Sequence, residues 1–329
     1  MRTGLFCTYE NPENDFSVAY AQQTELVRLI ENLGFEEAWI AEHHFNPNAS
    51  SPSPLTIIAH LAAVTTRLRL GAAAVLLPFH DPILVAEQVA TTDLLAQGRL
   101  DLGVAKGGPF PGQFKHFHVR PEDARDKAVE ALAIVERLLR GESLSFDGRF
   151  FRLEGVSLAP RPVQKPVPIF FATSTPETVA LAAERGFSVM AAPPFPLAHI
   201  AKTLDLYRQC APGADPRLVL IRFYHVAETK EAALTQARPW LEPFIERMRA
   251  TTKAIQPSWS PWMDLERLIE DSLIGSPADI RAKIERIAAS LDPRSLVLKP
   301  LSPDFETRKE NLKLFAETIA PLTAPHAAA

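Results

Sequence analysis

The 329-residue sequence predicts a (β/α)8 barrel, the TIM-barrel fold, with insertions. Short apolar runs alternate with amphipathic helical segments along nearly the whole chain, which is typical of parallel strands joined by crossover helices. The runs AAAVLL and IFFA are apolar without interruption, as expected for strands covered on both faces. About eight such units follow one another, and this number favours a closed barrel over an open, doubly wound sheet.

The first half of the chain is predicted to hold four strands. Residues 3–8 (TGLFCT) form an apolar run that breaks at Asn11-Pro12. In residues 18–33 the apolar side chains recur at the spacing of one helix face, and Gly34 then provides a natural stop. The same rhythm predicts strands at 37–41, 68–77 and 100–105, and helices at 55–65 and 82–95.

The second half continues the alternation. A strong helix is predicted at 121–140, followed by a small β-hairpin of residues 143–146 and 150–153 joined by Asp147-Gly148. Further strands are predicted at 167–172, 188–191, 218–227 and 295–298, separated by helices that begin near Pro176, Leu197, Thr229 and Pro277, with a last helix at 305–319.

Residues 240–274 interrupt this rhythm. They contain Pro257, Trp259, Pro261 and Trp262, and we predict that they form an insertion or lid over a strand–helix loop. No low-complexity tract or linker divides the chain. We therefore predict a single domain of residues 1–329, with a frayed Ala-rich tail at 320–329.

The composition argues against several classes of partner. Lys and Arg total 35 and Asp and Glu total 39, and this net charge of −4 gives no electrostatic reason to expect nucleic acid or an anionic membrane. No apolar run approaches the ~18 residues that span a bilayer, and the N-terminus lacks the apolar region of a signal peptide. With only Cys7 and Cys210, the chain is expected to be cytoplasmic and reduced.

Polar residues gather where the predicted strands end, which is where a (β/α)8 barrel builds its active site. Glu42, His43 and His44 directly follow the second strand. Adjacent strand residues point to opposite faces, so the two histidines are not expected to share a metal, and no HExxH motif is present. A histidine pair here is either structural or suited to proton transfer, and the residues alone leave both interpretations open.

A second polar group is suited to bind an anion. Lys106-Gly107-Gly108 follows the fourth strand, and Arg125 lies on the next helix. The run Thr173-Ser174-Thr175 precedes Pro176, at the start of a helix whose free N–H groups favour phosphate. An ordinary turn and helix cap would explain the same residues. The chain has neither GxGxxG after its first strand nor a P-loop motif.

Several segments resemble the bacterial luciferase-like flavin-dependent monooxygenases: AWIAEHHF, LGAAAVLLPFHDP, AEQVATTDLLAQGRLDLGVAKG and GSPADIRAKIERI. The resemblance extends from about Gly4 to Ile319. It implies a two-component enzyme in which a separate flavin reductase supplies reduced FMN. The flavin then reacts with O2 to a C4a-hydroperoxide that oxidises a small organic substrate, which is expected to be apolar and is not identified.

The resemblance also assigns roles to individual residues. His43 matches the catalytic imidazole, and Glu42 supports it on the flavin side of the site. Ala73-Ala74 matches a non-prolyl cis peptide that lies against the flavin ring. The flavin phosphate is expected at a group of four residues: Lys106, Arg125, Ser174 and Thr175. The chain departs from the closest luciferases at Lys106, where they have Arg, and at Ala105, where they have Cys, so we do not predict light emission.

Alternatives follow from the same fold. An F420-dependent oxidoreductase would transfer hydride without oxygen, and a non-catalytic flavin-binding protein would bind flavin without turnover. We also expect a homodimer, formed through the Ala- and Leu-rich helices 55–65 and 82–95, although these faces could equally cover the barrel. A substrate pocket could be lined by seven aromatic residues: Phe6, Phe79, Phe110, Phe114, Phe195, Trp259 and Trp262.

Overall fold

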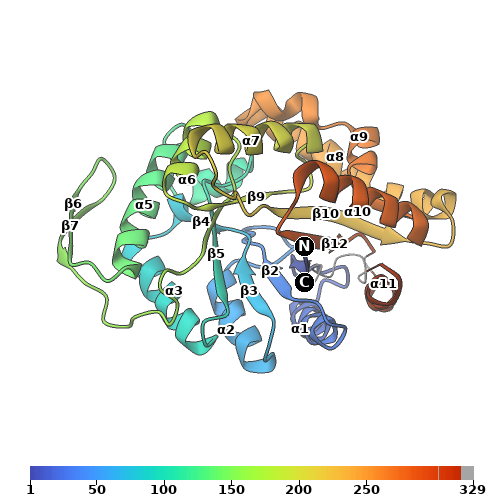
Figure 1. Ribbon diagram of the computed structural model, residues 1–329, viewed down its shortest axis with the longest axis horizontal. Coiled ribbons are helices and arrows are strands. Elements are labelled where there is room, and N and C mark those ends of the chain that lie inside the picture. The colour runs from blue at the N-terminus through green and yellow to red at the C-terminus, as the bar shows by residue number, and fades with distance from the viewer. Residues whose placement is uncertain (303, 320–329) are drawn as a thin grey trace.

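The computed structural model describes residues 1–302 and 304–319, so the expected tail at 320–329 lies outside the described residues. Eight parallel strands close into a barrel, which confirms the predicted fold (Figure 1). Strand β12 pairs with β1 and thereby completes the circle. In order around the barrel the strands are β1 (Arg2–Cys7), β2 (Glu37–Ile40), β3 (Arg69–Ala72), β5 (Leu100–Ala105), β8 (Ile169–Phe171), β9 (Ser188–Ala191), β10 (Val219–Val226) and β12 (Ser295–Pro300).

Two short strands extend this sheet. β4 (Val75–Leu76) pairs with β5, and β11 (Leu273–Gly275) pairs with β10. The single strand predicted at 68–77 is therefore wrong: β3 ends at Ala72, the Ala73–Ala74 peptide bond is cis, and a 3-10 turn η1 (Leu77–Phe79) follows β4. The hairpin of β6 (Leu144–Asp147) and β7 (Arg152–Val156) is antiparallel as predicted and projects away from the barrel in Figure 1.

Helices surround the barrel, and their ends follow from local sequence. The Asp15 and Asp81 carboxylates accept N–H bonds at the first turns of α1 and α3, and Ser276 and Asp279 form a capping box that opens α10. Gly34, at φ +86°, ends α1 as expected. The outer helices are α1 (Phe16–Asn32), α2 (Pro54–Val64), α3 (Pro82–Leu95), α5 (Ala124–Leu139), α6 (Pro176–Glu184), α7 (Leu197–Cys210), α10 (Pro277–Leu291) and α11 (Phe305–Thr318).

The region predicted as an insertion at 240–274 is largely regular. Helix α8 (Lys230–Ile255) continues past residue 240, although Pro239 and Pro243 each remove a backbone N–H donor. Both prolines lie on the exposed side, whereas a stripe of small and apolar residues packs inward and stabilises the helix. The irregular part is confined to the 3-10 segment η2 (Pro257–Trp262) and its flanks, before the short helix α9 (Leu265–Glu270).

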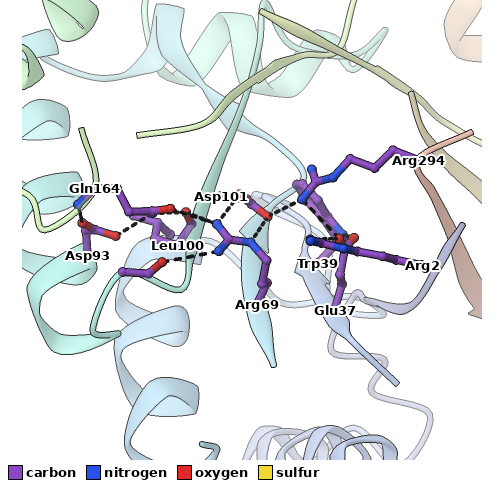
Figure 2. A network of polar contacts seen from close by, with 10 residues as sticks. Arg2, Glu37, Trp39, Arg69, Asp93, Leu100, Asp101, Gln164 and Arg294 are labelled. Atoms are coloured by element: carbon purple, nitrogen blue, oxygen red, sulfur yellow. Dashed lines mark hydrogen bonds and ion pairs between the residues drawn. The ribbon is translucent and has the colours of Figure 1, made fainter. Parts of the chain in front are cut away.

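The N-terminal end of the barrel is closed by an ionic network (Figure 2). The buried carboxylates of Glu37 and Asp101 are surrounded by the guanidinium groups of Arg2, Arg69 and Arg294. Each of these residues lies at or next to the beginning of a barrel strand. The network therefore forms a floor that leaves only the opposite end of the barrel open to function.

Above this floor the interior is filled with side chains. Trp39 and Phe170 meet edge-to-face at 5.1 Å between ring centroids. The backbone beside them is tightly placed: a Cβ atom on Gly103 would lie 2.0 Å from the carbonyl oxygen of Ala72. The fully buried members of this interior cluster are Trp39, Phe170, Met190, Val219, Ile221 and Val297, and those that keep some exposure are Phe6, Ala73 and Ala172.

Candidate active site at the C-terminal end of the barrel

His43 follows β2 on the inward-facing side. Trp39 belongs to the interior cluster, and side chains alternate along a strand, so His43 continues the inward row above it. Its backbone N–H donates to the Ser51 carbonyl at 3.1 Å, which fixes the loop. The ring Nδ1 atom is buried and has no hydrogen-bond partner among the described residues. Burial, followed by the positive charge of Lys299, lowers the pKa of His43 to about 4, so the imidazole is neutral near pH 7.

Glu42 holds two strand ends together. Its Oε1 atom is 2.7 Å from the Nε2 atoms of both His44 and His80, and its Oε2 atom accepts the Leu76 N–H at 3.0 Å. Burial raises the pKa of the Glu42 carboxyl, but the bonds from His44 and His80 outweigh burial and leave it below the usual value. Its carboxylate is thus engaged with groups of the protein, and the expectation from the sequence that Glu42 also belongs to the flavin-binding residues stays a prediction.

The sequence analysis did not single out His80, although the segment Phe79-His80-Asp81 follows the third strand. The Glu42, His44 and His80 donor atoms lie within 4.8 Å of one another, a spacing that a metal ion could also use. In the structure, hydrogen bonds join Glu42 Oε1 to the Nε2 atoms of both histidines, so these three atoms already have partners. We therefore interpret the group as a clamp between β2 and the segment after β4.

The predicted anion-binding residues follow β5 and β8, at a different part of the rim. Burial, followed by the positive charge of Arg125, lowers the pKa of Lys106. Arg125 also lies 3.5 Å from the Glu177 carboxylate in the first turn of α6. Ser174 and Thr175 lead into this helix, and no side chain caps it, because the Thr175 hydroxyl bonds to that of Thr178. Two cations beside an uncapped helix N-terminus fit a phosphate group.

The irregular segment after α8 covers this group. The Lys106 ammonium donates to Gln256 Oε1 at 3.3 Å. A cavity of about 30 Å³ remains between Lys106, Gly107, Phe114 and Trp259 and their neighbours. The short helix α4 (Pro111–His116) forms the other side of the cover. Gln256 and Trp259, from the region predicted as an insertion or lid, therefore lie beside Lys106.

The chain was compared with known proteins. The family described as luciferase-like monooxygenase matches residues 1–292. The chain belongs to this family. Its members include flavin-dependent monooxygenases, and the resemblance drawn from the sequence motifs is thereby confirmed.

Individual relatives span most of the chain. Limonene 1,2-monooxygenase of Rhodococcus erythropolis is 28% identical over 331 residues, covering 95% of this chain and 84% of the relative. The oxygenase component of a flavin-dependent trigonelline monooxygenase from Acinetobacter baylyi is 28% identical over 249 residues, covering 72% of this chain and 68% of the relative.

Solved structures agree on the fold. Monooxygenase RslO1 of Streptomyces bottropensis superposes with a TM-score of 0.85 at 29% identity, covering 98% of this chain and 100% of that chain. An F420-dependent secondary alcohol dehydrogenase superposes with a TM-score of 0.78 at 20% identity, covering 97% and 98%. The luciferase-like fold is thus shared by proteins that use different flavins.

The aromatic residues expected to line a pocket separate into groups. Phe195 packs edge-to-face on Trp259 and Trp262, at 4.9 and 5.6 Å between centroids. Phe79 packs on Phe114 at 5.3 Å. Phe110 packs against the cluster beneath α8, whereas Phe6 belongs to the barrel interior. Phe223 and Lys299 were not among the predicted site residues; they are register partners on β10 and β12.

Proposed function

We propose that this luciferase-like protein is the oxygenase component of a two-component FMN-dependent monooxygenase. Reduced FMN comes from a separate reductase, and O2 and a small, largely apolar organic compound are the other reactants. The observation that carries the proposal is the neutral imidazole of His43, with its unpartnered Nδ1 atom, at the open end of a barrel whose rim also carries Lys106 and Arg125.

The phosphate of FMN would be held by Lys106, Arg125 and the N-terminus of α6. A dianionic phosphate would neutralise two neighbouring cations and would accept hydrogen bonds from the free N–H groups of the helix. Ala73, which keeps some exposure at the top of the interior cluster, would lie beneath the flavin ring. When bound, reduced FMN supplies the two electrons that activate O2 for transfer of one oxygen atom.

His43 would move a proton at its Nδ1 atom. The imidazole is neutral near pH 7 and can accept a proton without first losing one. The backbone hydrogen bond to Ser51 would help to keep this segment in place. The cover formed by Gln256, Trp259 and the end of α8 would exclude water from the reacting groups.

We propose FMN and not F420 as the cofactor because the EHHF motif and the Ala73–Ala74 segment match the FMN-dependent members of the family. The trigonelline relative is described as an oxygenase component, which supports a separate reductase as the partner. A 3,6-diketocamphane monooxygenase from Pseudomonas putida, whose structure contains FMN, has the same fold at 22% identity.

The test combines binding with oxygen use. FMN, photoreduced FMN and F420 are titrated separately into the protein, and oxygen consumption is followed with each reduced cofactor. The proposal expects binding of FMN in preference to F420. It also expects that the protein changes the rate at which reduced FMN is reoxidised by O2, relative to free reduced FMN, and that this effect is lost in His43→Gln but kept in the surface control His60→Gln. Preferential F420 binding with hydride transfer and no oxygen use would replace the proposal with the dehydrogenase alternative.

The proposal also includes a homodimer formed through α2 and α3. A groove of about 310 Å³ lies between these helices and is lined by Leu55, Ala59, Leu84 and Leu95. Leu84 and Leu95 are 57% and 58% exposed, which is unusual for large apolar side chains on one face. Light scattering should give the mass of two chains, and Leu84→Glu should reduce it to one; a monomeric wild type would exclude the dimer.

A further inference from the structure

Lys299, near the end of β12, is a buried ammonium group that the proposed chemistry does not use. Val297, two residues earlier, belongs to the interior cluster, whereas Leu296 and Leu298 belong to the core outside the barrel. Side chains alternate along a strand, so Lys299 faces the interior above Val297. Its side chain is only 11% exposed. A lysine is rarely placed so deep without a specific partner.

Aromatic rings flank this ammonium. Lys299 is the register partner of Phe223 on β10. On the other side, the register of β1 and β12 pairs Leu5 with Leu298, and its continuation brings Phe6 beside Lys299. The ring of Phe223 packs edge-to-face on Phe244 of α8, at 5.1 Å between centroids. Lys299 is therefore placed between two aromatic residues on the neighbouring strands, which offer apolar surface to an organic compound bound at this end of the barrel.

Lys299 shares its carboxylate partner with a second buried cation. Its Nζ atom bonds to Glu10 Oε1 and to the Pro300 carbonyl, the latter at 3.3 Å. The other oxygen of Glu10 lies 3.7 Å from the buried guanidinium of Arg308. Asp304 acts on Arg308 as well, but among residues 1–302 and 304–319 no second carboxylate lies within 4.0 Å of Lys299. Among the described residues Glu10 is thus the one carboxylate within 4.0 Å of these two buried cations, and an additional anion would be stabilised beside Lys299.

The same ammonium is on the side of the barrel that carries His43. β12, β1 and β2 are consecutive neighbours in the sheet, and Lys299, Glu10 and His43 lie at or beyond their C-terminal ends. The phosphate-binding group, in contrast, follows β5 and β8. A compound held by Lys299 would therefore lie beside the proposed proton-transfer group and away from the flavin phosphate.

We propose that Lys299 is a specificity-determining residue that binds an anionic oxygen on an otherwise apolar, ring-containing substrate. A phenolate, an enolate and a carboxylate share this chemistry. On binding, the anionic oxygen takes the place of Glu10 as the partner of the ammonium, and the rings of Phe6 and Phe223 contact the apolar part. The identification of this ligand as the substrate rests on the proposed function, whereas the anion site itself is measurable without flavin.

The test uses two probes with the same ring system, 1-naphthoate and the uncharged 1-naphthamide. Their binding to the flavin-free protein is measured by calorimetry. The wild type should bind the carboxylate at least about tenfold more tightly than the amide. Lys299→Met should reduce this preference to within about twofold, because it keeps the length of the side chain and removes its charge. The exposed Lys313→Met, on α11, is the matched control and should keep the preference.

Glu10→Gln provides a test of opposite sign. Removal of the competing carboxylate should tighten naphthoate binding by about tenfold, a gain that misfolding cannot produce. Absence of naphthoate binding in the wild type, equal binding of the two probes, or a preference that survives Lys299→Met would each overturn the assignment. FMN binding is measured on the same preparations. A wild type that binds FMN but shows no naphthoate preference rejects only the assignment of Lys299, and a wild type that shows the preference but does not bind FMN rejects only the proposed cofactor.

Discussion

Arg69 and Asp101 form a two-point ion pair across neighbouring strands, with Arg69 Nη2 and Nε donating to the two Asp101 oxygens at 2.6 and 2.9 Å. Arg294 lies 3.7 Å from the same carboxylate and 3.5 Å from Glu37, so it links both buried acids. Trp39 Nε1–H donates to Glu37 at 2.8 Å and connects this floor to the interior cluster. Trp39 therefore connects the ionic network directly to the apolar interior of the barrel.

Replacing Asp101 should destabilise the barrel without changing its chemistry. Asp101→Asn leaves Arg69 and Arg294 without their shared carboxylate, and we expect a loss of about 3 kcal/mol in the free energy of unfolding. Urea titration followed by fluorescence measures it. Asp147→Asn, which breaks an exposed pair with Arg152, is the control and should have no measurable effect. A similar stability for both variants would mean that the network contributes little.

Gly103 should not tolerate even one methyl group. A Cβ atom there would lie 2.0 Å from the Ala72 carbonyl oxygen, and backbone atoms cannot move aside as a flexible side chain can. We expect Gly103→Ala to cost more than about 3 kcal/mol or to prevent folding. In contrast, Gly112→Ala on α4 meets nothing within 4 Å and should fold like the wild type. Thermal unfolding of the two variants measures the difference. Equal melting temperatures would show that the expected clash between residue 103 and the Ala72 carbonyl does not occur.

Lys106 should act on the phosphate and not on the flavin ring. Lys106→Met should weaken FMN binding by about tenfold to a hundredfold, because a charge-assisted bond to phosphate is lost. Riboflavin, which lacks the phosphate, should bind both forms about equally. The exposed Lys253→Met, near the end of α8, controls for a general loss of positive charge. An equal loss for FMN and riboflavin would place Lys106 elsewhere in the site.

The low pKa of His43 has a consequence for activity. In the proposed function His43 acts as a neutral base, so activity should fall only as the pH approaches about 4 and not near the ordinary value of 6.5. The groups that set this value are Lys299, Glu42, His44 and Arg247, in addition to burial. Lys299→Met should move the acid limb of the pH–rate profile upward. An acid limb near 6.5 in the wild type would show that His43 is not held neutral.

The lowered pKa of His43 also makes the free energy of unfolding depend on pH. The unfolded chain binds a proton at His43 below about 6.5, whereas the folded chain does so only below about 4. Stability should therefore decrease as the pH falls through this window, because the unfolded state binds more protons. Chemical denaturation at several pH values measures the slope. The slope should be smaller in His43→Gln, and an unchanged slope would assign the effect to other groups.

The sequence predicted the elements whose patterns are local. The helix at 82–95 and the strands at 100–105 and 188–191 have the predicted bounds, since periodicity and Pro82 define them. Residues 240–274 were predicted to be an insertion or lid because of Pro257, Trp259, Pro261 and Trp262. The irregular part is confined to η2 and its flanks, since inward packing stabilises α8 as far as Ile255. Lys299 and His80 could not be predicted from local patterns. Their partners, Glu10 and Glu42, are distant in sequence and come into contact with them only because the sheet closes into a barrel.

The ionic network closes the N-terminal end of the barrel, so the C-terminal end is the entrance to the interior. The ionic network and the interior side chains occupy the lower part, so the flavin, the organic compound and oxygen would all enter through the C-terminal mouth. Compounds that share one entrance cannot arrive in arbitrary order: whichever lies deeper must enter first and leave last. The order in which the reactants bind would therefore depend on how deep each of them lies in the barrel, and not on their affinities alone.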